Sequence, residues 1–160
     1  MGLAGTLGLE LPTGVEAFTS ETWDLVPGLY GSWRQGRWAT DLSLAYQWNG
    51  FADRTAQGVD PGDEWKADLA LAYQIPVGST GNLSVTPVLE FSYRQLSADR
   101  QAGLSLSNTG EWLTFVSPGL KVTCSSLILE GLVQLPVAQD QQGQQPEQGA
   151  RWLLGVRYMF

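Results

Sequence analysis

Residues that commonly carry enzyme chemistry are scarce in this sequence. Histidine is absent from all 160 residues, which excludes Ser-His-Asp and Cys-His catalysis, imidazole acid–base chemistry and histidine-ligated zinc. Cys124 is the only cysteine, so the chain forms neither an intramolecular disulfide nor a thiolate metal cluster. A lipid-modifying enzyme would need a catalytic base other than histidine. We predict that the protein is not an enzyme and has no cofactor.

One acidic stretch contains the residue types that bind calcium. Asp60, Asp63 and Glu64 follow one another closely, and carboxylate oxygens are the ligands that Ca²⁺ prefers. Acidic clusters of this kind are more often solvated loops, so a calcium site is the weaker of the two interpretations. We therefore predict no metal site, and we keep these three carboxylates as the candidate ligands.

The charge balance excludes another class of function. The chain has 16 acidic and 9 basic residues, a formal net charge of −7 and a pI near 4.4. Nucleic-acid binding needs a basic surface, so we expect no nucleic-acid partner.

Period-two alternation predicts that the charged residues lie on β-strands. Residues 83–94 show it most clearly, because Leu83, Val85, Leu89 and Phe91 alternate with polar side chains. Alternation of this kind predicts eight strands of about 9–12 residues each. They cover residues 3–11, 23–34, 37–48, 65–75, 83–94, 112–123, 127–137 and 151–160.

The connections between these strands alternate in length. Short turns occupy residues 35–36, 76–82 and 124–126, and long polar loops occupy residues 12–22, 49–64, 95–111 and 138–150. Outer-membrane barrels show this asymmetry, with short periplasmic turns and long extracellular loops. We therefore predict an all-β fold in which residues 1–160 form a single transmembrane antiparallel up-and-down β-barrel. It has eight strands, and both termini are periplasmic.

The aromatic residues indicate which face of the barrel meets the lipid. In a soluble barrel the apolar set would point inward, but an eight-stranded barrel has too little interior for so many large rings. Trp38 and Trp48 are ten residues apart on one predicted strand, which at ~3.4 Å rise and ~40° tilt spans about 26 Å, close to the apolar band of such barrels. The predicted membrane-interface girdle consists of Trp23, Trp33, Trp38, Trp48, Trp65, Tyr73, Tyr93, Trp112, Trp152, Tyr158 and Phe160.

The opposite face of the predicted strands supplies a polar network that lines the lumen. Its acids are Glu10, Asp24, Asp41, Asp68, Glu90 and Glu130, and its bases are Arg34, Arg37, Lys66, Arg94, Lys121, Arg151 and Arg157. Charges in a narrow interior must be paired or hydrated. The favoured interpretation is a polar plug that stiffens the barrel, and the alternative is a narrow polar path. No ring of one sign is evident, so the sequence predicts no ion selectivity.

The membrane location is predicted from the alternation and not from hydropathy. Mean hydropathy is −0.10, and no apolar run approaches the ~18 residues of a membrane-spanning helix. The N-terminus has no charged segment followed by an apolar one, so it shows no signal peptide. We expect that such a segment has been removed and that the protein is located in a bacterial outer membrane.

Several stretches resemble one outer-membrane family over nearly the whole chain. They are residues 25–29 (LVPGL), 44–50 (LAYQWNG), 61–64 (PGDE), 68–71 (DLAL), 116–120 (VSPGL), 133–140 (VQLPVAQD) and 153–160 (LLGVRYMF). In this order the sequence resembles the outer-membrane transporters of the "meta-pathway of phenol degradation" type. The resemblance implies an outer-membrane barrel that takes up small hydrophobic or aromatic compounds.

The chain also departs from the family pattern. Typical members are longer and carry further N-terminal strands, so this chain is either a short member closed at eight strands or a shortened form of a wider barrel. The terminal Phe160, with Tyr158 two residues before it, resembles the signal that the outer-membrane assembly machinery reads. The expected partners are this machinery, the lipid bilayer, lipopolysaccharide and small hydrophobic solutes.

A second function fits the same sequence. In it, the barrel has a plugged lumen and acts as a structural or surface-interaction protein through its acidic extracellular loops. The loop acids are Asp53, Asp60, Asp63, Glu64, Asp99, Asp140 and Glu147.

Overall fold

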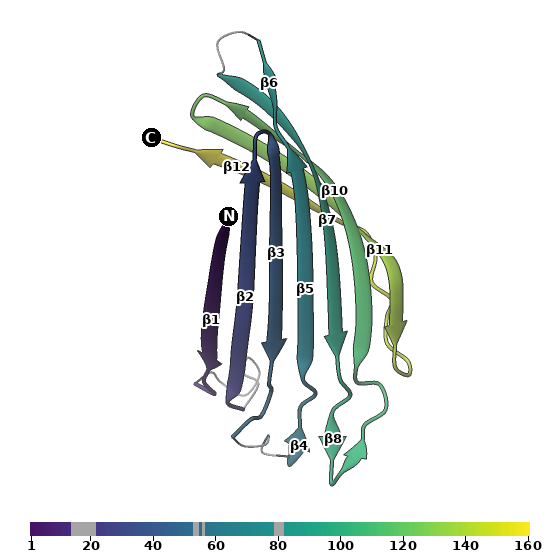
Figure 1. Ribbon diagram of the computed structural model, residues 1–160. Coiled ribbons are helices and arrows are strands. Elements are labelled where there is room, and N and C mark those ends of the chain that lie inside the picture. Colours follow the sequence, from purple (N-terminus) through teal and green to yellow (C-terminus); the bar gives the residue numbers. More distant parts are fainter. Residues whose placement is uncertain (14–21, 53–54, 56, 79–81) are drawn as a thin grey trace.

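The structure, a computed structural model, describes residues 1–13, 22–52, 55, 57–78 and 82–160. It is all-β and antiparallel, as the alternation predicts, and the described residues contain no helix long enough and apolar enough to cross a bilayer (Figure 1). The main sheet contains β1 (Gly2–Glu10), β2 (Asp24–Gln35), β3 (Trp38–Gln47), β5 (Glu64–Tyr73), β7 (Leu83–Leu96), β10 (Glu111–Cys124), β11 (Leu127–Gln141) and β12 (Arg151–Tyr158).

These eight strands follow one another across the sheet in chain order. The order is β1-β2-β3-β5-β7-β10-β11-β12, so every strand pairs with its neighbours in the sequence, as in an up-and-down meander. The short β6 (Ile75–Val77) also pairs with β7, beyond the end of β5. A separate small sheet contains β4 (Val59–Asp60), β8 (Arg100–Gln101) and β9 (Leu104–Ser105), which come from two long loops.

Two tight hairpins set the register of neighbouring strands. Gln35 pairs with Trp38 across the β2–β3 turn, and Cys124 pairs with Leu127 across the β10–β11 turn. Two-residue hairpin turns favour a positive φ at the first central position. Gly36 has φ 58° and Ser125 has φ 52° at these positions, so both turns have the expected backbone geometry.

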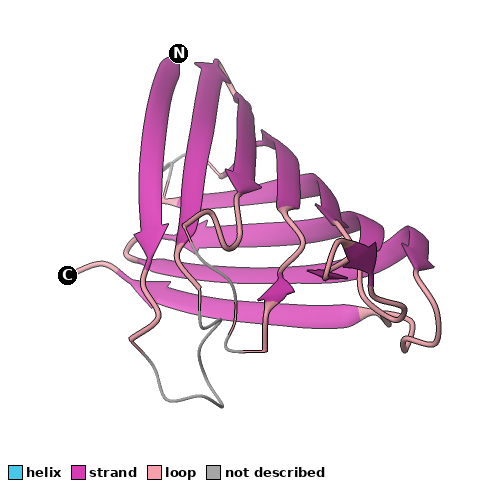
Figure 2. Ribbon diagram, turned by 90° about the horizontal axis from the view of Figure 1, so that it is seen from below, coloured by secondary structure: helices cyan, strands magenta, loops and turns pink. Residues whose placement is uncertain are grey.

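The register divides the side chains into two faces, which we call the inner and outer sets. Asp41, Ala70, Glu90 and Ser117 lie side by side on β3, β5, β7 and β10 and belong to the inner set. The outer set consists of the alternate residues, mostly large and apolar, and includes Leu42 and Trp65. Exposed fractions of 44% for Leu42 and 54% for Trp65 show that this apolar face is uncovered. The inner set lines the hollow of the curved sheet, whose bend is seen in Figure 2.

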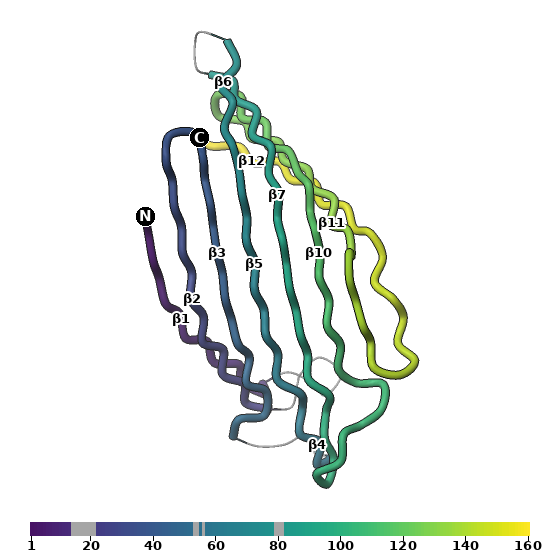
Figure 3. Tube along the Cα trace, turned by 45° about the vertical axis from the view of Figure 1, so that its right-hand side comes forward, coloured from purple at the N-terminus to yellow at the C-terminus, as the bar shows by residue number. Residues whose placement is uncertain are grey.

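The two ends of the sheet differ in their connections. The hairpin turns at residues 36–37 and 125–126 and the β6 segment lie at one end, which we call the turn end. The long connections after β1, β3, β7 and β11 lie at the other, the loop end. Both termini lie toward the turn end of the sheet (Figure 3). This is the arrangement that the predicted connection lengths require.

The strand limits differ from the sequence prediction mainly toward the loop end. β7 ends at Leu96, β10 begins at Glu111 and β11 ends at Gln141, all beyond the predicted limits. These extensions are mostly polar, so hydrophobic alternation does not detect them, while backbone pairing continues through them. The predicted strand ends at Trp23, Trp48 and Phe160 lie just outside β2, β3 and β12.

The prediction of a closed barrel differs from the structure. β1 pairs only with β2, and β12 pairs only with β11, so the sheet is open between its first and last strands. Closure is obligatory where edge N–H and C=O groups face hydrocarbon, because nothing else there can pair with them. The alternation of side chains along each strand does not determine whether the first and last strands pair with each other.

Candidate functional site

The middle of the hollow is acidic and rich in hydroxyl groups. Asp41, Asp68 and Glu90 come from the adjacent strands β3, β5 and β7 and line a cavity of about 480 Å³. The Ser43 hydroxyl donates a hydrogen bond of 2.9 Å to Asp68 Oδ2, and Ser92 lines the same cavity. This part of the hollow therefore offers hydrogen-bond acceptors and hydroxyl groups to a polar solute.

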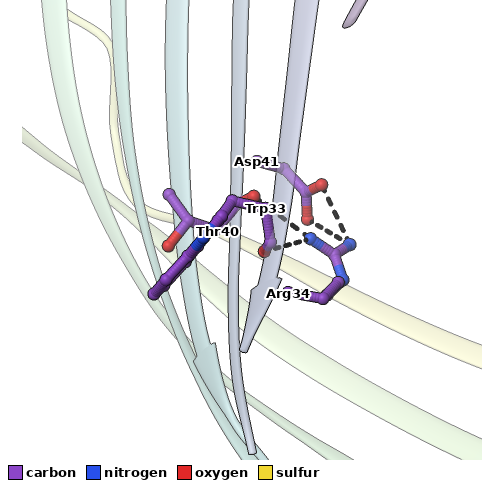
Figure 4. A network of polar contacts seen from close by, with 4 residues as sticks. All are labelled: Trp33, Arg34, Thr40 and Asp41. Carbon is purple, nitrogen blue, oxygen red and sulfur yellow. Dashed lines mark hydrogen bonds and ion pairs between the residues drawn. The ribbon is translucent and has the colours of Figure 1, made fainter. Parts of the chain in front are cut away.

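Asp41 is paired with Arg34 across the β2–β3 hairpin (Figure 4). Arg34 Nη1 also donates to the carbonyl oxygens of Trp33 at 3.0 Å and Thr40 at 3.1 Å. These contacts fix the guanidinium at the wall of the hollow, next to the acidic middle. The bond to Asp41 neutralises one of the three carboxylates there.

The turn end of the hollow collects basic side chains. A cavity of about 670 Å³ is lined there by Arg34, Arg37 and Lys121. The sequence placed Arg37 on a strand, but it lies in the β2–β3 turn, because the hairpin needs two residues outside the ladder. Glu130 is 3.4 Å from Arg157, and the register places it beside Lys121. Positive and negative groups therefore alternate at this end.

The loop end contains a buried carboxylate that the sequence placed in a loop. Glu64 is the first residue of β5, and its side chain is only 6% exposed. Its Oε2 is 2.8 Å from Lys66 Nζ, and its Oε1 accepts a hydrogen bond from Arg94 Nε. Lys66 also donates to Gln47 Oε1 at 3.4 Å. Glu64 thus belongs to the inner polar network. Its alternation with Lys66 and Asp68 is the feature of the sequence from which this assignment could have been made.

The candidate calcium ligands are not brought together. Asp63 accepts hydrogen bonds from the Tyr46 hydroxyl at 2.6 Å and from Asn49 N at 3.1 Å, and Glu64 forms ion pairs with two cations. Asp60 lies in β4, where its backbone is the register partner of Arg100 in β8. Within the described part of the chain, no three His, Cys, Asp or Glu side chains are placed to hold a metal ion.

Two further predicted acids lie where β1 and β2 reach the loop end. Glu10 and Asp24 are register partners. Asp24 is 1% exposed and accepts hydrogen bonds from Thr22 Oγ1 at 2.8 Å and from Gly50 N at 2.9 Å. A carboxylate that is buried and bonded in this way fixes the loop that follows β3 against the start of β2.

Arg151 contacts an aromatic ring and an amide, unlike the four predicted bases that form ion pairs, which are Arg34, Lys66, Arg94 and Arg157. Its guanidinium carbon lies 5.9 Å from the centre of the Phe115 ring, and its Nη2 donates to Gln148 Oε1. Phe115 and Leu113 are 5% and 2% exposed and belong to the inner set, with Ser92 and Arg94 as their partners on β7. The sequence analysis missed these two residues. Their inward position could have been inferred from the alternation, because Trp112 next to them points outward.

The predicted girdle residues lie on the outer face toward both ends of the sheet. Exposed fractions reach 55% for Trp38 near the turn end and 75% for Trp152 near the loop end. Trp38 and Tyr73 lie across the β3–β5 pair, with ring centroids 4.7 Å apart. The turn end carries Trp33, Trp38, Tyr73, Tyr158 and Phe160, and the loop end carries Trp23, Trp48, Trp65, Tyr93, Trp112 and Trp152.

One family model matches this chain, over residues 2–145, and it is described as "Putative MetA-pathway of phenol degradation". The match covers β1 to β11 and most of the sequence. The chain belongs to this family. No curated protein and no solved structure matches it significantly. Membership of the phenol-degradation family confirms the resemblance seen in the sequence. Both the family and the all-β fold are compatible with an outer-membrane location, and the family suggests a transport-related role.

The loops of this member of the phenol-degradation family are tied to one another. Asp99 Oδ1 accepts a hydrogen bond of 2.9 Å from Gly62 N, and Gln101 Nε2 donates to the Gln57 carbonyl at 3.0 Å. Together with the small sheet of β4, β8 and β9, these bonds join the loop after β3 to the loop after β7. The predicted loop acid Asp53 lies outside the described residues, and Asp140 lies within β11.

Proposed function

We propose that this protein is a non-enzymatic outer-membrane β-barrel that acts as a narrow conduit for small molecules. The observation that carries the proposal is that the two faces of one sheet have opposite polarity. The outer face is apolar and exposed, with aromatic rings toward both ends, and the inner face is charged and encloses cavities. A soluble sheet places its apolar face inside, so the reverse arrangement suits a bilayer.

The polar inner face supports a hydrated path. The ion pairs that the described residues form all lie within the inner set, and they are Arg34–Asp41, Lys66–Glu64, Arg94–Glu64 and Arg157–Glu130. Most of these side chains are about half exposed, as water-filled passages require. The near balance of charge favours neutral or weakly polar solutes over ions of one sign. Family membership makes small aromatic or hydrophobic compounds the first candidates.

The proposed partners follow from the same surface. The apolar outer face would contact lipid, and aromatic rings at its two ends would lie at the two interfaces. Lipopolysaccharide would meet the loop end, and the assembly machinery would read the C-terminal strand that ends near Phe160. In lipid, β1 and β12 would pair with each other, because an open edge in hydrocarbon leaves backbone groups without partners.

Single-channel conductance of the refolded protein in a planar bilayer tests the conduit. Discrete current steps whose size rises with salt concentration are the expected result, because a hydrated lumen conducts in proportion to its mobile ions. The same protein in liposomes should admit small uncharged solutes, measured by swelling. A membrane that stays silent with folded protein present, and liposomes that admit no solute, would contradict the proposal.

The tied loops favour a second candidate, a surface-interaction barrel with a plugged lumen. The small sheet of β4, β8 and β9 gives the loop end a defined surface, which a conduit alone does not need. Deleting residues 98–109 removes β8 and β9 and leaves β7 and β10 to be joined by a short turn. If this variant folds but loses binding to lipopolysaccharide, the second function is supported.

A further inference from the structure

The two cavities of the hollow lie in its middle and toward the turn end, and apolar side chains are buried at the loop end. The cavities are lined by residues from the middle and the turn end of the strands, among them Tyr30, Asp41, Glu90 and Lys121. At the loop end Leu113 is 2% exposed and Phe115 is 5% exposed, while the charged ends of Lys66 and Arg94 remain about half exposed. The buried apolar pair therefore narrows the hollow at this level.

The filling at the loop end includes the only two large apolar side chains buried in the described part of the chain. Leu113 and Phe115 follow one another on the inner face of β10. On β10 the two large apolar groups stand apart, because the other inner positions of this strand are Glu111, Ser117, Gly119, Lys121 and Thr123. Elsewhere Leu132 and Leu153 also face the hollow, but they line its open cavity and are not buried. Their position at one level of the hollow indicates a specific local role.

The connection between β11 and β12 is held beside these two side chains by hydrogen bonds. Gln145 Nε2 donates to the Gly110 carbonyl at 3.0 Å, and Gln148 N donates to Gln139 Oε1 at 3.0 Å. Gln139 is the register partner of Leu113, so this bond holds the segment 142–150 beside the apolar pair. Asn108 Oδ1 accepts a further bond from Gln144 N at 2.7 Å.

Arg151 completes the cover. It follows the segment 142–150 directly, and its guanidinium lies 5.9 Å from the Phe115 ring centre, within the range of a cation–π contact. It also bonds to Gln148 within the same segment. Below this level, Ser117 is 1% exposed, and its hydroxyl has no hydrogen-bond partner among the described residues. Opening of the cover would admit water to this hydroxyl.

We propose that Leu113 and Phe115, covered by segment 142–150 and Arg151, form the constriction that limits which solutes pass through the hollow. This inference rests on the proposed conduit function and assigns its selectivity to the loop end. The acidic middle and the basic turn end then form a vestibule that solutes fill from the turn side. Solutes pass only when they fit beside the Phe115 ring or when the segment moves away.

The test compares conductance and solute uptake in four variants. Phe115→Ala removes the ring, and Val116→Ala removes a side chain from the outer face of the same strand. Arg151→Ala opens the cover without removing a buried group, and Val156→Ala removes an exposed side chain from the outer face of β12. We expect Phe115→Ala and Arg151→Ala to raise conductance and the size limit for sugars severalfold. Val116→Ala and Val156→Ala should match the parent protein.

The outcomes separate this proposal from the conduit itself. If the parent protein conducts and all four variants match it, the constriction is wrong and the conduit stands. If the parent protein is silent and Phe115→Ala or Arg151→Ala conducts, the constriction is supported as a closed plug. If every protein is silent, the conduit is wrong, and the constriction is then decided by a measurement that needs no current.

That measurement is thiol labelling at Ala70, an inner residue in both cavities. Ala70→Cys is made together with Cys124→Ala, and a membrane-impermeant methanethiosulfonate is added to vesicles of phosphatidylcholine and phosphatidylglycerol. The exposed Cys124 of the parent protein reports which end faces the reagent. From the loop side we expect slow labelling that Arg151→Ala accelerates severalfold. Fast labelling from that side without Arg151→Ala would overturn the constriction.

Discussion

Arg34 and Asp41 face each other across the β2–β3 hairpin, and a single guanidinium nitrogen of Arg34 donates to both carboxylate oxygens, at 2.8 and 2.9 Å. The two side chains are 55% and 50% exposed. An ion pair in contact with water gains little from its Coulomb attraction. The strength of this pair therefore reports whether the hollow around it is hydrated.

A double-mutant cycle measures that strength. We expect Arg34→Met and Asp41→Asn to give a coupling free energy of about 0.2–1 kcal/mol, the range of exposed pairs, and we expect it to fall as salt is added. The free energy of unfolding is measured by urea titration in lipid vesicles. A coupling of several kcal/mol that does not respond to salt would show a dry lumen and would contradict the hydrated path.

Leu71 tests which face of the sheet meets the lipid. It is an outer-set residue in the middle of the sheet, with Thr40 and Leu89 as register partners. Leu71→Arg should lower the free energy of unfolding in lipid by roughly 2–4 kcal/mol, because arginine then lies at the middle of the bilayer. Ala70→Ser, on the inner face next to it, should change little. The opposite order of effects would invert the assignment of the two faces.

Glu64 tests the inner polar network at the loop end. Its buried carboxylate bonds to Lys66 and Arg94, which are 44% and 47% exposed. Glu64→Gln keeps the shape but removes the charge, and we expect a loss of about 1–3 kcal/mol, as for hydrogen bonds to charged groups. The exposed Asp68→Asn is the control and should cost less. Equal stability of Glu64→Gln and the parent protein would show that the two ion pairs contribute nothing.

The sequence predicted the arrangement of strands well, because alternation and connection length are local signals. Each of the eight predicted segments overlaps one of the eight strands that cross the main sheet, in the predicted order. The limits were less accurate toward the loop end, where β11 continues to Gln141 through glutamines and an aspartate. Pairing there depends on the neighbouring strand β10, and the residue pattern of one strand does not show how far its neighbour extends.

For the candidate site, the sequence predicted which face of the sheet each side chain lies on, but not which side chains contact one another. Alternation placed Asp41 and Arg34 on the same face, but it did not show that they bond to each other. The sequence analysis assigned Glu64 to a loop, since a turn-like Pro-Gly-Asp stretch precedes it. Glu64 is nevertheless two residues before Lys66 and so has the alternation of an inner residue. Leu113 and Phe115 were missed because the interior was expected to be polar. Interiors of this kind are identified from packing, which alternation does not describe.

Tryptophan fluorescence tests whether the aromatic rings lie at the bilayer interfaces. In variants that keep only Trp38 or only Trp112, we expect lipids brominated near the headgroups to quench emission more than lipids brominated near the chain ends. The reason is that amphipathic rings settle at the interface. Trp38 lies near the turn end and Trp112 near the loop end of the sheet, so the two variants sample both leaflets. Stronger quenching from the bilayer centre would contradict the girdle.

The open edges lead to the last prediction. β1 and β12 each lack a partner on one side, and in an even meander these two strands run antiparallel, so they are able to pair. In lipid, unpaired edge groups each cost several kcal/mol, and summed along a strand this cost exceeds the stability of a whole domain. We therefore expect the outward edge amides of Gly2–Glu10 and Arg151–Tyr158 to be protected from hydrogen exchange in vesicles.

The central strands provide the comparison for that exchange experiment. Amides of β5 and β7, which pair on both sides, define full protection. Protection of β1 and β12 at the same level, independent of protein concentration, would show closure within one chain. Protection that appears only as the protein concentration rises would show closure with a second copy. Rapid exchange at both edges in folded, lipid-inserted protein would contradict a closed barrel. The proposed conduit would then have no continuous wall of paired strands.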